Sequence, residues 1–405
     1  MTIEIRPTKP DEYRTAANTF SAALLTPALT EEQWEQRRAS WDECSSISAW
    51  DERQCVGHAA QFLVETTVPG GARLTTGAVS RVGVSSTHRR QGVATGLMEA
   101  LVRDASDRQL ALMSLRASEA VIYKRYGFGI AGESCSVEIK PTSAHPISGA
   151  VIGGSFRIVP ADELLDVVPP LYDRVAHRRP GVITRPMSWW HRYLEDAIDQ
   201  SKASFVVVHR SPSGEADGYA HYEVEWNDNI SDGSTGVGEI HDVWGATDGI
   251  ELALWEFVLS VDLVSTWKAT ERPTDDLIRR AMRNPRAYGY KAIDDEQWLR
   301  LIDVDVALNT RRYHPTDRAV TIQVSDSILS HNNGTWRVDA SGASTTSAEP
   351  DLVTDIAGLS AAYLGGTSWW ALTTTRAVES RRAGAAADAE LLFASRPLPF
   401  CGSFF

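Results

Sequence analysis

The sequence predicts an α/β fold with two related mixed-sheet domains, followed by a smaller third domain of alternating strands and helices. Three observations support this prediction. A strand, a basic loop and a helix follow one another between residues 79 and 105, the pattern around them recurs in weaker form over 156–261, and apolar strand and helix patterns alternate again after residue 292. The predicted domains span residues 1–145, 150–291 and 292–405.

The first domain begins with a short strand at Ile3–Arg6 and continues as an alternation of helices and strands. The turn Pro69-Gly70-Gly71 separates two long strand patterns, and a linker is expected over 141–155, which contains two prolines and three glycines. The other predicted helices cover residues 10–20, 31–41, 93–105 and 118–126, and the other strands cover 46–50, 54–67, 74–84, 110–116 and 135–139.

The junction Arg89-Arg90-Gln91-Gly92-Val93-Ala94 combines the features of an anion site at the start of a helix. The first turn of a helix has four backbone N–H groups without intrahelical partners, and the positive end of the helix dipole lies there. Gly92 leaves the backbone open to close approach, and the two arginines can add charge-assisted hydrogen bonds. The spacing is neither that of a P-loop nor Gly-x-Gly-x-x-Gly. It predicts a phosphate-bearing ligand, the alternative being a basic surface turn.

This segment resembles the coenzyme A pyrophosphate loop of the GNAT superfamily of N-acyltransferases, whose pattern is Arg/Gln-x-x-Gly-x-Gly/Ala after a splayed strand. A second match follows at Tyr123-Lys-Arg-Tyr-Gly-Phe128, which is similar to the superfamily's Tyr-x-x-x-Gly-Phe signature. The first tyrosine of that signature is the usual general acid. The resemblance therefore places this role on Tyr123, whereas Tyr126 is expected to pack beside the helix.

The second domain repeats the order of the first. Phe156-Arg-Ile-Val-Pro160 echoes Ile3-Glu-Ile-Arg-Pro7, and the patterns at 204–209, 218–226, 238–244 and 250–261 mirror later elements. At the loop position this copy has Gly245-Ala-Thr-Asp-Gly-Ile250, with an aspartate and no arginine. We therefore expect a GNAT-like fold that does not bind coenzyme A at this place and instead supports and lines the substrate cleft.

The third domain is similar to sterol carrier protein domains. Strands or strand-helix pieces are predicted over 297–308 and 320–328, a strand over 334–340, an amphipathic helix over Val353–Leu364 and a second helix over Ala383–Phe393. Such domains can hold lipids, but a packing role is expected here. The chain ends in Phe400-Cys-Gly-Ser-Phe-Phe405, which is too apolar for a frayed terminus and is expected to be docked.

Two GNAT-like domains, a carrier-like domain and an aromatic carboxyl terminus together resemble the Eis (enhanced intracellular survival) family of bacterial acetyltransferases along the whole chain. The resemblance implies acetyl-CoA-dependent N-acetylation of aminoglycosides at several amines, acetylation of protein lysines in some members, and a homohexamer of two trimers. It implies direct transfer with Tyr123 as general acid and the α-carboxylate of Phe405 as general base. A water relay is the alternative for the base.

The same resemblance assigns binding roles to further residues. The backbone of the splayed strand would hold the pantetheine arm, and the loop and the start of its helix would hold the pyrophosphate. The cofactor-binding residues are Val82, Gly83, Val84, Arg89, Arg90, Gln91, Gly92, Val93, Ala94, Thr95, Ser118 and Glu119. Substrate contacts fall on Trp34, Arg116 and Phe404. The chain departs from the family at 20–23, where alanine replaces an acidic pocket residue, and Arg116 adds a positive charge.

Composition narrows the class of protein. The net charge of -13 argues against general nucleic-acid binding and suits a cationic small-molecule amine. The four cysteines and ten histidines lack metal-ligand spacing, so no metal is predicted, and reduced thiols fit a cytoplasmic protein. No apolar run is long enough to span a membrane. A protein lysine N-acetyltransferase and a non-catalytic acyl-CoA- or lipid-binding protein are the alternatives to a small-molecule acetyltransferase.

Overall fold

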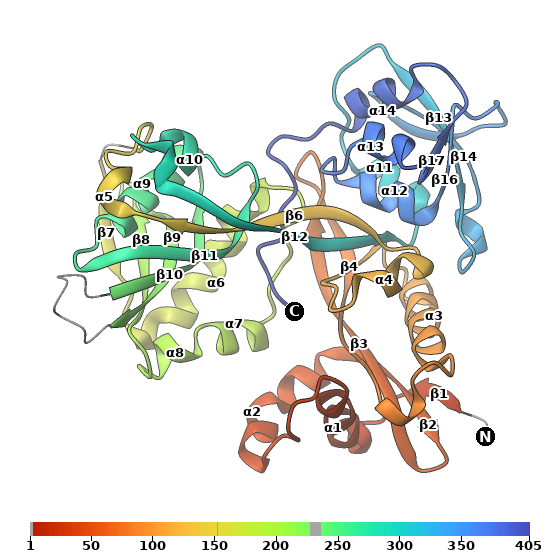
Figure 1. Cartoon of the computed structure of the whole chain (residues 1–405), viewed down its shortest axis with the longest axis horizontal. Helices are drawn as coiled ribbons and strands as arrows, with labels where there is room; N and C mark the ends of the chain where they lie inside the picture. The colour runs from red at the N-terminus through yellow and green to blue at the C-terminus, as the bar shows by residue number, and fades with distance from the viewer. Residues whose placement is uncertain (1–2, 152, 227–235) are drawn as a thin grey trace. The chain divides into compact units, whose positions relative to one another are not determined.

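A computed structural model describes residues 3–151, 153–226 and 236–405, which form two compact units (Figure 1). Unit 1 comprises Met1–Gly132, Glu296–Arg396 and Phe404–Phe405. Unit 2 comprises Glu133–Asp295 and Pro397–Ser403. The chain leaves unit 1 within strand β6 (Gly129–Ile139) and returns to it within strand β12 (Tyr288–Leu301). The chain therefore contributes three separate segments to unit 1.

The first sheet of unit 1 has the strand order β1-β2-β3-β4-β5, and the second half of β12 follows β5. The β4–β5 pair is parallel and the other pairs are antiparallel, which confirms the predicted mixed sheet. The strands are β1 (Glu4–Pro7), β2 (Cys44–Asp51), β3 (Gln54–Thr67), β4 (Arg73–Val84) and β5 (Leu112–Leu115).

Helices of unit 1 cover this sheet at the positions that the sequence predicted. The fifteen-residue helix α3 (Val93–Asp107) buries Val93, Leu97 and Leu101 against β2, β3 and β4, which is the expected apolar face at three- and four-residue steps (Figure 1). The other helical segments are η1 (Pro10–Glu12), α1 (Tyr13–Ala23), α2 (Glu31–Asp42), η2 (Ser86–His88), α4 (Ala120–Tyr123) and η3 (Lys124–Tyr126).

Unit 2 contains a second mixed sheet of order β6-β11-β10-β9-β8-β7. Its strands after β6 are β7 (Ser155–Ile158), β8 (Ser204–Arg210), β9 (Ala216–Trp226), β10 (Gly236–Gly245) and β11 (Val264–Pro273). Its helical segments are α5 (Pro141–Ala144), η4 (Ala161–Glu163), α6 (Leu164–Val175), η5 (Ala176–Arg178), α7 (Met187–Tyr193), α8 (Glu195–Ile198), α9 (Asp248–Leu259), α10 (Ile278–Ala281) and η7 (Pro285–Ala287).

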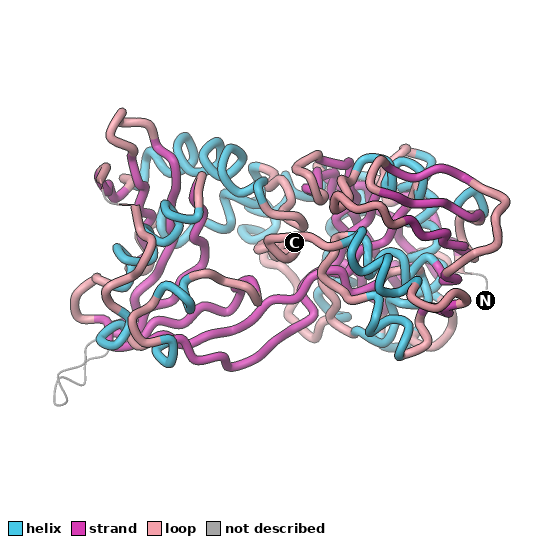
Figure 2. The backbone as a smooth tube through the Cα atoms, turned by 90° about the horizontal axis from the view of Figure 1, so that it is seen from above, coloured by secondary structure: helices cyan, strands magenta, loops and turns pink. Residues whose placement is uncertain are grey.

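The internal repeat predicted from the sequence is present in the structure. In unit 1 the parallel pair β4–β5 is joined through α3, and in unit 2 the parallel pair β10–β11 is joined through α9. Figure 2 shows helices and strands in both halves of the view. One expectation was wrong: part of the linker at 141–155 is the helix α5, and Ala144 and Ile147 pack in the core of unit 2, because apolar residues interrupt the proline- and glycine-containing stretch.

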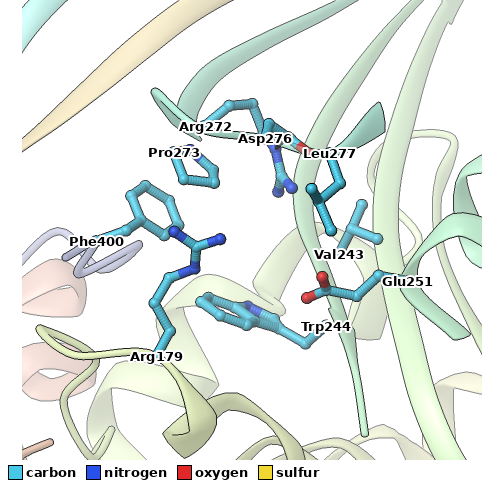
Figure 3. Close-up of a pocket in the computed structure, with 9 residues that line it drawn as sticks. All are labelled: Arg179, Val243, Trp244, Glu251, Arg272, Pro273, Asp276, Leu277 and Phe400. Atoms are coloured by element: carbon cyan, nitrogen blue, oxygen red, sulfur yellow. Dashed lines mark hydrogen bonds and ion pairs between the residues drawn. The ribbon is translucent and has the colours of Figure 1, made fainter. Parts of the chain in front are cut away.

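A pocket in unit 2 opens where β10 and β11 end (Figure 3). Val243 and Trp244 of β10 line one side, and Arg272 and Pro273 of β11 line another. The remaining lining residues come from helical segments and loops of the same unit and are Arg179, Glu251, Asp276, Leu277 and Phe400.

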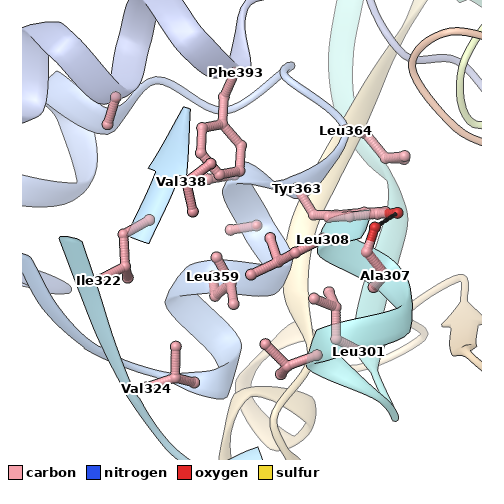
Figure 4. Packing of buried hydrophobic residues seen from close by; sticks show 14 of the residues in the cluster. Leu301, Ala307, Leu308, Ile322, Val324, Val338, Leu359, Tyr363, Leu364 and Phe393 are labelled. Atoms are coloured by element: carbon pink, nitrogen blue, oxygen red, sulfur yellow. Dashed lines mark hydrogen bonds between the residues drawn. The ribbon is translucent and has the colours of Figure 1, made fainter. Parts of the chain in front are cut away.

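The carrier-like part of unit 1 has a five-stranded sheet of order β15-β14-β13-β16-β17. Its strands are β13 (Ala319–Ser325), β14 (Gly334–Asp339), β15 (Gly342–Thr345), β16 (Leu352–Asp355) and β17 (Val378–Ser380). Its helical segments are α11 (Val304–Thr310), η8 (Ser330–Asn332), α12 (Ile356–Tyr363), α13 (Trp369–Thr374) and α14 (Ala385–Phe393). Side chains from sheet and helices fill the core, where the hydroxyl of Tyr363 donates to Ala307 O at 2.8 Å (Figure 4).

The amphipathic helix predicted over Val353–Leu364 was wrong in two respects. Val353 to Asp355 belong to β16, and Asp355 caps α12 by accepting from Gly358 N. All eight residues of α12 are buried, so the helix has no polar face. Small residues such as Ala361 and Ala362 allow neighbouring elements to approach it from every side.

Candidate active site

Strand β4 continues beyond its parallel neighbour in unit 1. The last β4–β5 partners are Val79 and Leu115, yet β4 extends to Val84. The β3–β4 register shifts between His58 and Ala60, and Arg81 has a φ of 56°, so a bulge turns the end of β4. The predicted residues Val82, Gly83 and Val84 form this extension, where alternate backbone groups face away from β3. These backbone N–H and C=O groups can form hydrogen bonds with an extended ligand.

The loop after β4 leads to an open helix terminus. Arg90 has a φ of 63° and Gly92 a φ of 83°, and Gly92 is the N-cap of α3 with no side-chain cap hydrogen bond. A Cβ at Gly92 would meet nothing within 4 Å, so the glycine is required by its backbone conformation rather than by crowding. The amides of the first turn, from Val93 onward, are free of a capping side chain and can bind an anion.

Basic and polar side chains surround this helix start. Arg90 and Gln91 are exposed, and the exposed Arg89 donates to Ala23 O at 3.2 Å. Ala94 and Thr95 are half-buried at the start of α3. The Thr95 hydroxyl lies 3.2 Å from the hydroxyl of Tyr126, which ties the helix to the signature segment. The residues predicted to bind pyrophosphate therefore lie together at the start of α3.

Tyr123 lies at the end of α4 and is 4% exposed. Its ring is 6.3 Å from that of Phe128 and 6.4 Å from that of Trp298. Burial raises the pKa of Tyr123 above its ordinary value of 10, and a hydrogen bond with Ser118 partly offsets that rise. Ser118 and Glu119 are both exposed at the start of this segment. The phenol is thus held protonated at neutral pH, as a proton donor requires.

The end of the chain meets a charged pair in unit 1. The guanidinium carbon of Arg116 lies 5.4 Å from the ring centroid of Phe404, which is 64% exposed, and Phe405 is half-buried. Arg116 Nη1 lies 3.5 Å from Oε1 of Glu296, whose side chain is fully buried. Sequence reasoning missed Glu296. The acidic run 294–296 ahead of an apolar strand was the one signal for it.

Trp34 and His58 lie in buried surroundings. Trp34 is 7% exposed and packs 6.0 Å from Trp41, so its predicted substrate contact has no support from this arrangement. His58 is fully buried, lies 3.0 Å from Ser48 Oγ, and packs beside Trp41. Burial lowers the pKa of His58 to about 3. His58 is therefore a packed residue rather than a candidate base.

Across residues 3–151, 153–226 and 236–405, no group of three or more His, Cys, Asp and Glu side chains is arranged to hold a metal ion. None of the helices in these ranges is long and apolar enough to cross a bilayer.

Family models match most of the chain. A model described as an acetyltransferase (GNAT) domain matches residues 4–131, a second GNAT model matches 181–301, and a sterol carrier protein domain model matches 304–402. These matches confirm the predicted fold class of two GNAT domains followed by a carrier-like domain.

Relatives match over the whole chain or most of it. An uncharacterized N-acetyltransferase of Streptomyces griseus is 31% identical over 100% of both chains. The N-acetyltransferase Eis of Mycobacterium tuberculosis is 28% identical over 67% of each. The crystal structure of Eis1 from Mycobacterium abscessus superposes with a TM-score of 0.89 at 32% identity, covering 99% of this chain and 100% of the other.

Proposed function

The chain belongs to the Eis-like N-acetyltransferases of the GNAT superfamily, and on that premise we propose that it moves acetyl groups from acetyl-coenzyme A to cationic multi-amine small molecules such as aminoglycosides. The observation that carries the proposal is the uncapped start of α3 beyond the splayed end of β4. There the backbone leaves both an extended strand edge and an anion site open to one ligand.

Acetyl-coenzyme A can occupy the two parts of this site with successive parts of its own length. The backbone of Val82, Gly83 and Val84 would hold the pantetheine arm as an added strand would be held. The first-turn amides of α3, with Arg89 and Arg90 beside them, would hold the pyrophosphate. Gln91 to Thr95 complete the cradle, and Ser118 and Glu119 would contact the coenzyme beside Tyr123.

Tyr123 and the end of the chain supply the proton transfers in this proposal. The α-carboxylate of Phe405 takes a proton from the acceptor nitrogen as that nitrogen attacks the thioester carbonyl carbon. The C–S bond then breaks, and Tyr123 donates its proton to the departing sulfur. The Tyr123 phenol carries the proton that this role needs, because its ordinary pKa of 10 lies above neutral pH and burial raises that pKa further. Both residues belong to unit 1.

Charge favours a cationic acceptor. The chain carries a net charge of -13, which attracts cations over long distances. Near the end of the chain, buried Glu296 compensates the positive charge of Arg116. The positive charge of Arg116 disfavours a polyamine-like substrate, and Glu296 neutralises that charge. Phe404 and Arg116 are the proposed acceptor contacts, and Trp34, which is buried, is not among them.

A thiol-release assay with acetyl-coenzyme A tests the proposal. Full-length protein is compared with a variant lacking Phe405 on aminoglycosides, polyamines and lysine peptides. We expect turnover on the multi-amine small molecules and loss of most of it in the variant, with acetyl-coenzyme A binding unchanged. Turnover on lysine peptides alone would instead identify a protein acetyltransferase. Full activity without Phe405 would refute the carboxylate base.

Assembly and location complete the proposal. We propose a homohexamer of two trimers, which mass photometry at assay concentrations would reveal. The four cysteines are buried, and none of them forms a disulfide. Such thiols fit the reducing cytoplasm, which is where we place the enzyme.

A further inference from the structure

The tail segment, defined as Pro397–Ser403, is bound into unit 2 by its backbone. Arg179 Nη1 donates to Leu398 O at 2.7 Å, and Leu398 N donates to Asp275 Oδ2 at 2.8 Å. Phe400 N donates to Pro180 O at 2.9 Å. Phe400 and Cys401 are buried. The segment before the carboxyl end is thus a fixed part of unit 2.

The tail segment occupies the opening between β10 and β11. Their parallel pairing ends at Glu239 and Lys268, after which both strands continue separately. Phe400 stacks on Trp244 near the end of β10, with ring centroids 6.0 Å apart, and lines one pocket with Arg272 and Pro273 of β11 (Figure 3). The cavity left there is only about 10 Å³, room for about one water molecule.

This opening corresponds to the one at the end of β4 in unit 1, which we assign to acetyl-coenzyme A. In unit 2 the adjoining helix start is closed to phosphate, because Thr247 caps α9 by accepting from Ile250 N. Asp248 in its first turn adds negative charge. The degenerate copy therefore holds the chain's own tail segment where the other copy has an open slot.

Arg185 secures the last part of the tail segment. Its side chain is 1% exposed and forms a bidentate pair with buried Asp242, at 2.6 and 3.2 Å. The same guanidinium donates to Gly402 O at 2.6 Å and to Ser403 Oγ at 2.9 Å. Its carbon lies 4.0 to 5.3 Å from the ring centroids of Tyr172, Trp189, Trp190 and Tyr193.

Asp242 is held as a carboxylate by several donors. Burial alone would raise the pKa of Asp242, but Arg185 and hydrogen bonds bring it below its ordinary value of 3.8. Tyr219 Oη donates to it at 2.9 Å and Trp244 Nε1 at 2.8 Å. With both charges satisfied, the guanidinium has one well-defined orientation, which is what an anchor for a chain end requires.

The chain also turns sharply at this anchor. Gly402 has a φ of 62°, and a Cβ there would lie 2.8 Å from the Phe400 ring and 2.9 Å from the Trp244 ring. Arg185 binds Gly402 and Ser403 immediately before Phe404 and Phe405, the two residues that group with unit 1. Arg185 therefore fixes the backbone two residues before the carboxyl end.

We propose that Arg185, held by Asp242, is the positioning residue for the C-terminal carboxylate. In the second GNAT domain, the opening between β10 and β11, which corresponds to the cofactor site of the first domain, binds the tail segment instead. This inference rests on the proposed function, in which that carboxylate is the base. Arg185 acts through the backbone of Gly402 and the hydroxyl of Ser403 and does not itself touch substrate.

The test uses the full-length chain with Arg185→Lys, which keeps the charge but loses the planar fork, and Ser403→Ala, which leaves the Arg185–Asp242 pair intact. Arg300→Lys is the matched control, because Arg300 also forms a buried bidentate pair, with Asp326, in unit 1. Two quantities are measured: the rate at which carboxypeptidase releases Phe405, and kcat alongside the Kd for acetyl-coenzyme A.

We expect faster release of Phe405 in Arg185→Lys and Ser403→Ala than in wild type or Arg300→Lys. We also expect kcat to fall roughly 10- to 100-fold with the Kd for acetyl-coenzyme A unchanged, since misplacing a reacting group by about 1 Å has effects of this size. If Arg185→Lys does not fold, Ser403→Ala carries the test alone.

Two outcomes would overturn the inference, and a third separates it from the proposed function. Release at the wild-type rate in both variants would show that Arg185 does not hold the tail segment. Faster release with unchanged kcat would show that its hold does not position the base. Full activity of the variant lacking Phe405 would instead refute the base itself, and the release rates would still report on the anchor.

Discussion

Arg116 Nη1 lies 3.5 Å from Oε1 of Glu296, and the Glu296 side chain is fully buried whereas that of Arg116 is 15% exposed. The same guanidinium packs near the ring of Phe404, the residue before the chain end. A carboxylate near the start of the unit 1 part of β12 therefore lies beside a cation that we assign to the proposed acceptor site. Removing this carboxylate would take a negative charge away from that site.

Glu296→Gln should weaken binding of polycationic acceptors. The change removes the negative charge that lies 3.5 Å from Arg116, so we expect the KM for a polyamine or aminoglycoside to rise roughly three- to tenfold, as partly screened charges would produce. The KM for a monoamine should change less, and the Kd for acetyl-coenzyme A should not change. Equal KM values for wild type and variant on every acceptor would show that the pair has only a structural role.

Arg90→Ala should weaken acetyl-coenzyme A binding. Removing one charge-assisted hydrogen bond to pyrophosphate should raise the Kd about tenfold, and the effect should shrink as salt is added. Isothermal titration at two ionic strengths would measure it. Arg103→Ala is the control, because Arg103 lies exposed on α3, the helix that follows the loop of Arg90, and its partners are Glu99 and Ile328 O. An equal loss of affinity in both variants would show that the overall loss of a positive charge, and not a contact made by the loop, weakens binding.

Tyr123→Phe should lower kcat by about 10² to 10⁴, the usual contribution of a general acid. In wild type, kcat should stay constant through pH 9, because burial raises the pKa of Tyr123 above 10 and the phenol loses its proton only at higher pH. The fall in kcat that titration of Tyr123 would cause at higher pH should be absent in the Tyr123→Phe variant. Tyr126→Phe, which removes only the contact with Thr95, should keep most of the activity. Similar losses in both variants would argue against a specific acid.

Glu251→Gln should stabilise the protein at alkaline pH. Burial raises the pKa of Glu251 to about 7, although Arg178 and Arg272 oppose the rise. A raised folded pKa means that the stabilisation is complete below the unfolded value near 4.5 and is lost as pH rises through 7. Urea unfolding should therefore show equal stability at pH 4 and a gain of about 2–3 kcal/mol for the variant at pH 8.5.

The control for Glu251 is Glu225→Gln, because Glu225 is an exposed carboxylate in β9 of the same unit. This variant should unfold like wild type at both pH values. A gain for Glu251→Gln that is the same at pH 4 and pH 8.5 would mean that titration of this carboxylate is not the cause.

The sequence was sufficient for features that depend on a few consecutive residues. The spacing of Arg89, Gly92 and Ala94 indicated a helix start open to phosphate, and the structure has an uncapped N-terminus there. The repeat around 156–261 and the missing arginines at 245–250 likewise indicated a second copy with a different loop. The prediction over Val353–Leu364 failed because Val353-Thr-Asp355 is too short to distinguish the end of a strand from the start of a helix, and Asp355 is the N-cap of α12.

Contacts between distant residues were decided only by the tertiary structure. Glu296 and Arg116 are 180 positions apart, and Arg185 binds Asp242 together with Gly402 and Ser403 near the end of the chain. Periodicity reports which face of an element is apolar, but it does not report which other element covers that face. Which residue pairs with a buried charge depends on how the strands of each domain splay and pack. In our proposal, this packing made the second domain a binding site for the tail segment.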